Sequence, residues 1–200
     1  MRVLIVSKTR MWEAFCVGGL LKETNENVRL MQPGGFNQPL TTPYEVGQVW
    51  EIDFTKREDL MLPHCEDIIV QHGTCLGHVK NIEETLLNLV DVWQGNPEIL
   101  FEGLLRFTAN GSGYISHRIG LPEQSVGFWI TDKSLHKEKD GDRIRYQVAH
   151  HAAKLAYVGA AEPIEVIPAG TLLRVSLARW WRPSIEVEER CYLQLSGWYL

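Results

Sequence analysis

Short runs in which apolar residues alternate with polar ones, or dominate, recur along the chain and are separated by turn residues, which is typical of β-strands. In the first third this pattern predicts strands over 2–8, 14–21, 27–31, 47–54 and 66–71, with loops at 33–35 and 42–43. In the last third it predicts strands over 126–132, 142–148, 155–159, 170–178 and 190–199. The stretch 146–156 also fits a short helix. The pair Asp140-Gly141 predicts a hairpin with a type I′ turn.

The two sets of predicted strands match each other in order. Gly47 and Gly170 each open a strand, and each is followed after 24 residues by a glutamine, Gln71 or Gln194, so the offset is 123 residues at both places. The other strands match at offsets of about 124–128. We interpret this as a duplication of one five-stranded unit. A closed barrel removes the free edges of so small a sheet, and the OB-fold is the five-stranded barrel of this size, with an SH3-like barrel as the alternative.

The segment between the two units is predicted to contain a helix. Asn81 is placed as its N-cap, with Glu84 three residues later. An apolar face follows, and Gly95 and Pro97 end the helix; the face comprises Ile82, Leu86, Leu89, Val90 and Trp93. Residues 99–107 fit another strand or a buried segment. The prediction is therefore a mainly β chain of two tandem OB-like barrels, over 1–72 and 125–200, with a helical connector over 73–124.

Composition and charge narrow the class of function. Of the 200 residues, 44% are hydrophobic and 22% are charged. This composition is typical of globular proteins and excludes a disordered or fibrous chain. The net charge is −5: residues 1–100 contribute −6 and residues 101–200 contribute +1. A protein that binds nucleic acid through bulk charge is basic, so any such contact is expected to be local and in the second half.

The N-terminus and the cysteines indicate the compartment. The apolar run that starts at Val3 is four residues long, which is too short for a signal peptide or a membrane-spanning helix. The four cysteines are widely scattered. We therefore expect a cytoplasmic protein with reduced thiols and no membrane contact.

Arg179-Trp180-Trp181-Arg182 is the strongest local feature. Two indoles flanked by two guanidiniums can stack on bases and hold phosphates, as single-strand binders do. The alternative is that one tryptophan closes the barrel end and the arginines solvate its rim. Neighbouring strand residues point to opposite faces, so at most one of the two is expected in the core.

Two further loops carry basic residues where OB-folds contact ligands, between the first two strands. In the first barrel this loop offers Lys8, Arg10 and Trp12. Its counterpart, residues 133–139, offers Lys133 and Lys137, although Glu138, Asp140 and Asp142 dilute its charge. A solvated charged surface is the alternative interpretation of both loops.

Five potential metal ligands fall within residues 64–78: His64, Cys65, His72, Cys75 and His78. Cys75 and His78 have the spacing of a zinc knuckle, but no Cys-x-x-Cys pair is present, and the sequence alone leaves open whether these residues bind metal. A metal-assisted hydrolase built on them is a third hypothesis. No nucleophile elbow, HExxH or P-loop is present, so we expect neither catalytic residues nor a cofactor, and we assign no metal ligands.

Several motifs together resemble a bacterial family, the dual-OB-containing domain. They are Ser7-Lys8-Thr9-Arg10, Cys16-Val17-Gly18-Gly19-Leu20, residues 28–33 (VRLMQP), residues 62–67 (LPHCED) and residues 191–199. Met11-Trp12-Glu13 departs from the glycines expected in the first loop. The resemblance implies a non-enzymatic module associated with nucleic acids and phage defence.

The sequence therefore favours a binding module for single-stranded nucleic acid or a nucleotide, accessory to a defence-type system. Its expected contact residues are Arg179, Trp180, Trp181, Arg182, Lys8, Arg10, Trp12, Lys133 and Lys137. The alternative is an adaptor whose acidic first barrel docks a larger effector protein from the same operon without touching nucleic acid.

Overall fold

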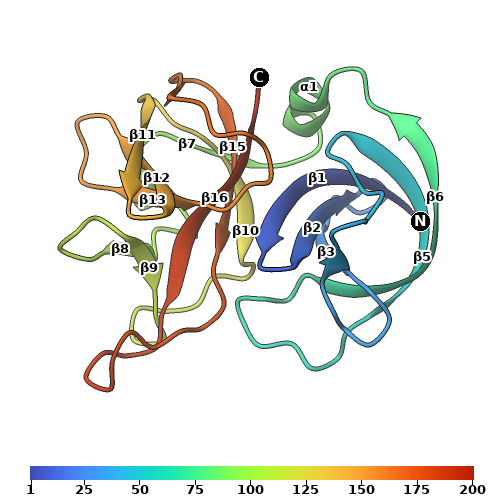
Figure 1. Cartoon of the computed structure of the whole chain (residues 1–200), viewed down its shortest axis with the longest axis horizontal. Coiled ribbons are helices and arrows are strands. Elements are labelled where there is room, and N and C mark those ends of the chain that lie inside the picture. Colours follow the sequence, from blue (N-terminus) through green and yellow to red (C-terminus); the bar gives the residue numbers. More distant parts are fainter. The chain divides into compact units, whose positions relative to one another are not determined.

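The computed structural model describes residues 1–200 and divides the chain into two compact units. The first comprises Met1–Met61 and Cys65–Asp91; the second comprises Leu62–His64 and Val92–Leu200. Both consist mainly of strands (Figure 1). The connector residues 73–124 are thus shared, with 73–91 in the first unit and 92–124 in the second. No helix in the structure has both the length and the apolar character needed to cross a membrane.

The five predicted strands of the first unit are confirmed, and a short sixth strand, β4, joins them. They are β1 (Arg2–Met11), β2 (Ala14–Leu21), β3 (Asn27–Met31), β4 (Gln38–Pro39), β5 (Gln48–Lys56) and β6 (Asp67–His78). Pairing runs β1–β2–β3–β6–β5 and back to β1, so the barrel closes. Only β3 and β6 are parallel. This is the OB-fold order, and it excludes the SH3-like alternative.

Alternation of side chains explains the core of this barrel. On β5, Trp50 and Ile52 are buried and Glu51 and Asp53 are exposed, as the period of a half-buried strand requires. β1 departs from this alternation, because its apolar run is buried on both faces and contributes four consecutive residues that are at most 2% exposed: Val3, Leu4, Ile5 and Val6.

The predicted helix begins where expected and ends early. α1 spans Ile82–Leu87, and its cap is confirmed because the Glu84 N–H donates to Asn81 Oδ1 over 3.0 Å. The predicted continuation to Gly95 is wrong. Residues Val92–Gln94 form β7, which pairs in parallel with β10. The Trp93 ring packs against Phe101, and it occupies the space next to Gly127, where an added Cβ would lie 2.1 Å from it. Tertiary packing therefore overrides the helical period here.

The second unit starts with the 3₁₀ turn η1 (Pro97–Ile99) and the buried residues Leu100, Phe101 and Leu105. Its strands are β8 (Arg106–Phe107), β9 (Gly113–Ile115), β10 (Val126–Ile130), β11 (Leu135–Asp140), β12 (Arg143–Val148), β13 (Lys154–Tyr157), β14 (Val166–Ile167), β15 (Leu172–Leu177) and β16 (Cys191–Tyr199). Residues 146–156 are strand, turn and strand rather than helix.

β10 and β11 together take the place of the first strand of an OB barrel. β10 pairs with β15 and β11 pairs with β12, while β13 and β16 form the parallel pair. The predicted ligand loop at 133–139 is therefore largely a strand, which is a correction. The hairpin at Asp140 is confirmed, but its two turn residues are Gly141 and Asp142. Of these only Gly141 has positive φ, at 62°, which is the pattern of a type II′ rather than a type I′ turn.

The register of corresponding strands supports the duplication. In the first barrel Trp50 pairs with Cys75 and Phe54 with Val70. In the second, Leu173 pairs with Trp198 and Leu177 with Leu193, each shifted by 123 residues. Gly47 and Gly170 have φ values of 91° and 82°, and their N–H groups donate to Ile5 and Thr131, each over 2.9 Å.

Candidate functional site

The loop that joins β15 to β16, residues 178–190, carries the Arg-Trp-Trp-Arg segment. It corresponds to the loop between strands 4 and 5 of an OB barrel, which is one of the two loops that such folds use for oligonucleotides. Trp180 is half-buried. Its ring stacks on His117 with centroids 4.2 Å apart and planes at 7°, and its Nε1 donates to the Leu62 carbonyl over 3.0 Å. One face of this indole and its only polar atom are thus used within the protein.

Trp181 has the opposite environment. It is 57% exposed, and its backbone pairs with Arg190 through two hydrogen bonds of 3.0 and 2.9 Å, which hold the two ends of the loop together. The Trp181 ring lies 5.9 Å from that of Tyr192. Of the two tryptophans, Trp181 therefore has the ring available to an outside ligand.

Tyr192 leads to a larger group of planar side chains. β9 pairs with β16, which places Tyr114 opposite Tyr192 with ring centroids 6.2 Å apart. The Arg190 guanidinium lies over the Tyr114 ring at 3.9 Å, a close cation–π contact. We call Tyr114, Trp181, Arg190 and Tyr192 the aromatic surface.

Sequence reasoning missed Tyr114, Arg190 and Tyr192 as contact residues. Tyr114 lies in a three-residue strand, and it meets Tyr192 only through a pairing across 78 positions of the chain. The two exposed arginines of the predicted segment, Arg179 and Arg182, lie in the same loop.

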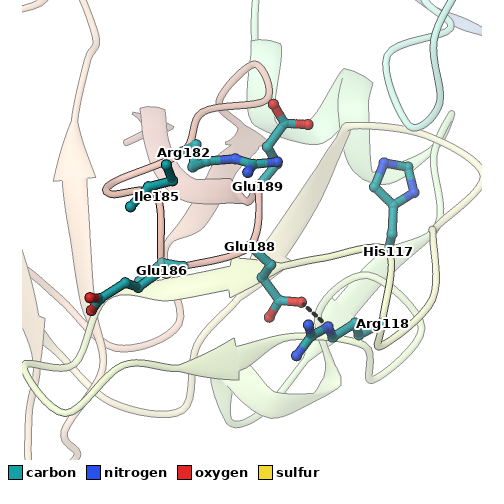
Figure 2. Close-up of a pocket in the computed structure, with 8 residues that line it drawn as sticks. His117, Arg118, Arg182, Ile185, Glu186, Glu188 and Glu189 are labelled. Atoms are coloured by element: carbon teal, nitrogen blue, oxygen red, sulfur yellow. Dashed lines mark ion pairs between the residues drawn. The ribbon is translucent and has the colours of Figure 1, made fainter.

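A pocket of about 340 Å³ opens beside the same loop (Figure 2). His117 and Arg118 contribute from the segment after β9. The loop contributes Arg182, Ile185, Glu186, Val187, Glu188 and Glu189. Arg118 Nε and Glu188 Oε2 form an ion pair of 3.2 Å, which Figure 2 marks, and Arg190 approaches the other oxygen at 3.8 Å. The pocket thus combines carboxylates with guanidiniums.

The basic residues predicted in the first barrel lie on the β1–β2 hairpin. Lys8 forms a 2.6 Å ion pair with Glu45 and lies 4.6 Å above the Phe15 ring, so its charge is matched locally. Arg10 is exposed, 5.8 Å from the same ring. Trp12 is fully exposed, with φ of 56°, at the tip of the hairpin. These residues belong to a different unit from the 179–182 segment.

Lys133 and Lys137 also have partners within the protein. The Lys133 ammonium donates to Asn96 Oδ1 over 3.0 Å, and Lys137 forms an ion pair with Glu165. Ion pairs also link β11 to the next two strands, Asp140 with Arg145 of β12 and Glu138 with Lys154 of β13. Several charges of this surface are therefore matched within the protein.

The five potential metal ligands do not form one cluster. His64 is buried in the second unit, with Nε2 at 3.6 Å from Cys191 Sγ. His72, Cys75 and His78 are spread along exposed residues of β6 in the first unit. No group of three or more His, Cys, Asp or Glu side chains in residues 1–200 is placed to hold a metal ion. Burial raises the pKa of Cys191 to about 12, which keeps this thiol neutral.

Comparison with known proteins agrees with this architecture. No curated protein matches the chain in sequence. The family model of the dual OB-containing domain matches residues 1–198, which is nearly the whole chain. The chain therefore belongs to the dual OB-containing domain family.

Proposed function

We propose that the chain binds single-stranded nucleic acid through the aromatic surface of the second barrel. The observation that carries this proposal is the 57% exposed Trp181 on an OB ligand loop, with its ring beside Tyr192, which in turn lies beside Tyr114. Exposed rings on such a loop stack on bases of any sequence, and each stacked base contributes about 1–3 kcal/mol. An OB-fold also provides a rigid barrel that fixes the position of these rings.

Arginines next to the rings supply the contacts to phosphate. Arg179 and Arg182 flank the two tryptophans and are exposed, while Arg190 is fixed over Tyr114. Because the whole chain has a net charge of −5, binding rests on these few cations rather than on a general positive potential. The proposal therefore includes a moderate affinity with a shallow dependence on salt.

The variant Trp181→Ala tests the site. In a fluorescence-anisotropy titration with a labelled 12-mer of dT or U, we expect the dissociation constant to rise about tenfold, which is what the loss of one stacked base implies. Val166→Ala is the matched control, because Val166 is an exposed apolar residue of the same unit outside the loop. Equal affinity of the two variants for the oligomer would sink the site assignment.

A second candidate function, docking of a larger effector protein, rests on the first barrel. Trp12 is fully exposed, and Met11 and Leu40 are 39% and 54% exposed. The pairings of Met11 with Ala14 and of Ala14 with Pro39 bring these residues to one end of the barrel. Exposed tryptophans are frequent anchors of protein interfaces.

This adaptor function has its own test. A pull-down with the products of neighbouring genes should retain an effector with the unchanged chain and lose it with Trp12→Ala. An effector from a defence-type system would extend the proposal to the accessory role that the sequence resemblance implies. Retention of the same effector by Trp12→Ala would contradict docking through this hairpin.

A further inference from the structure

The pocket beside the aromatic surface contains a carboxylate with unused hydrogen-bonding capacity. Glu188 Oε2 is buried and forms no hydrogen bond, although Arg118 Nε lies 3.2 Å away in an ion pair. The Nε of Arg190, whose guanidinium approaches the same carboxylate at 3.8 Å, is also a buried group without a hydrogen-bond partner. A buried polar atom left without a hydrogen-bond partner is destabilising, so this arrangement favours a ligand that donates to Glu188.

The charges around Glu188 limit the class of that ligand. Arg118 and Arg182 line the pocket together with Glu186 and Glu189, and Arg190 approaches the Glu188 carboxylate, so the pocket presents both cations and carboxylates. A nucleotide fits such a lining, because its phosphate can pair with Arg118 or Arg182 while its base donates to Glu188. Its flat base can also extend the stack of Trp180 on His117, since His117 lines the pocket.

The donor pattern of the base decides which nucleotide is favoured. A carboxylate is a pair of acceptors. Guanine presents two adjacent donors, N1–H and N2–H₂, on its Watson–Crick edge. Adenine and cytosine each place an acceptor beside their amino group, and uracil has a single donor between two acceptors. Only guanine therefore presents two donors to the Glu188 carboxylate, and it must displace the Arg118 contact to reach the buried Oε2.

We propose that this pocket is a guanine subsite of the nucleic-acid surface; the inference rests on the proposed function and adds base specificity to it. The volume of about 340 Å³ is at the lower end of the range for small-ligand sites, roughly 300–1,000 Å³, and suits one nucleotide. One guanosine of a bound strand would occupy the pocket while its neighbours stack on the aromatic surface.

The first test needs no variant. GMP, AMP, CMP and UMP are compared as ligands of the full chain by isothermal titration calorimetry. A 12-mer of U and the same 12-mer with one central G are compared by anisotropy. We expect GMP and the G-containing strand to bind at least about fivefold more tightly than the others, the lower end of what a bidentate base contact provides. Equal affinities for the two strands would overturn the guanine subsite and leave the proposed function standing; failure of both strands to bind would overturn the proposed function instead.

The second test changes the chemistry of the acceptor. Glu188→Gln replaces one oxygen by a donor, so the side chain can pair with the donor–acceptor edge that each of the four bases presents. We expect its preference for GMP to disappear, with the affinities for AMP, CMP and UMP rising relative to GMP. Glu162→Gln, at an exposed glutamate of the same unit, is the matched control and should keep the GMP preference. A Glu188→Gln chain that still prefers GMP, or that weakens equally for all four nucleotides, would overturn the role of Glu188.

Discussion

The hairpins β5–β6 and β15–β16 have the same strand register, but equivalent positions in the two barrels carry different side chains. Glu51 of the first barrel pairs with Thr74 and is exposed; Arg174, 123 residues later, pairs with Gly197 and is 1% exposed. The buried guanidinium lies 4.5 Å from the Phe128 ring. One duplicated scaffold thus tolerates a solvated carboxylate and a buried cation at the same strand position.

The two barrels also differ in the side chains of their parallel strand pairs, β3–β6 and β13–β16. In the first barrel Arg29 and Asp67 lie opposite each other and form a double hydrogen bond of 2.6 and 2.7 Å. In the second barrel the two opposed pairs are Ala156 with Gln194 and Tyr157 with Leu195, and neither is an ion pair. The first barrel therefore connects its parallel strands through an ion pair, and the second relies on backbone pairing and packing.

The loops differ most. The first barrel presents its exposed tryptophan on the β1–β2 hairpin, and the second presents Trp181 on the β15–β16 loop beside an aromatic surface and a pocket. The comparison teaches that the strands preserve the fold while the loops carry the differences relevant to binding. The following changes test that division, beginning with the largest expected effect.

Asp67→Ala should destabilise the first barrel by about 3–5 kcal/mol, because it leaves the partly buried Arg29 without its carboxylate. Gln194→Ala, at the parallel strand pair of the second barrel, removes no charge pair and should cost about 1 kcal/mol or less. Urea unfolding measures both, and hydrogen exchange locates the loss to β3 and β6. Equal losses of unfolding free energy in the two variants would contradict the difference between the parallel strand pairs of the two barrels.

Trp181→Ala and Trp12→Ala should separate the two loops by function. We expect Trp181→Ala to weaken binding to a single-stranded oligomer by about 1–3 kcal/mol and Trp12→Ala to leave that affinity unchanged. Anisotropy titrations of both variants under the same conditions give the comparison. A larger loss with Trp12→Ala would transfer the nucleic-acid site to the first barrel.

Gly47→Ala and Gly170→Ala should each cost about 1–2 kcal/mol, because both positions have left-handed φ values that disfavour a Cβ. An added Cβ would lie 3.4 Å from His78 at Gly47 and would meet nothing within 4 Å at Gly170, so sterics add little at either site. Similar losses of stability in the two variants, measured by thermal or urea unfolding, would support the structural equivalence of Gly47 and Gly170. A loss of stability in only one variant would argue against that equivalence.

High pH should weaken the second barrel, and the first barrel also has groups, Cys16 and Tyr44, whose pKa values are raised by burial. Burial raises the pKa of Cys191 and of Tyr146 to about 12 each, from ordinary values of 9 and 10. The folded protein then keeps protons that the unfolded chain releases, so stability is complete below about pH 9 and falls as the pH rises toward 12. We expect a loss of about 1 kcal/mol from Cys191 at pH 10. An unchanged stability of the second barrel between about pH 8 and pH 11, measured by urea unfolding, would contradict this.

Most of the fold could be predicted from the sequence because the strands of both barrels bury one face. The segments that escaped prediction lack that signal. β11 reads Leu-His-Lys-Glu-Lys-Asp and has no apolar alternation, since its side chains form ion pairs such as Lys137–Glu165 and Lys154–Glu138. The helix was predicted too long because Trp93 fits a helical face equally well, and only its pairing with β10 shows it to be in a strand.

The candidate site could be predicted only in its local part. The Arg-Trp-Trp-Arg segment is visible in the sequence, but nothing local distinguishes Trp180, stacked on His117, from the exposed Trp181. Tyr114 and Glu188 reach the site through long-range strand pairing and a loop conformation. Such arrangements depend on tertiary structure and leave no periodic pattern.

The most direct test of the account is an anisotropy titration of the unchanged chain with labelled single-stranded DNA and RNA at about 50 and 200 mM salt. Stacking supported by two or three arginine–phosphate contacts predicts binding at the lower salt that weakens by about fifteenfold at the higher salt, with a logarithmic slope near −2. Absence of binding at the lower salt would contradict the proposed function.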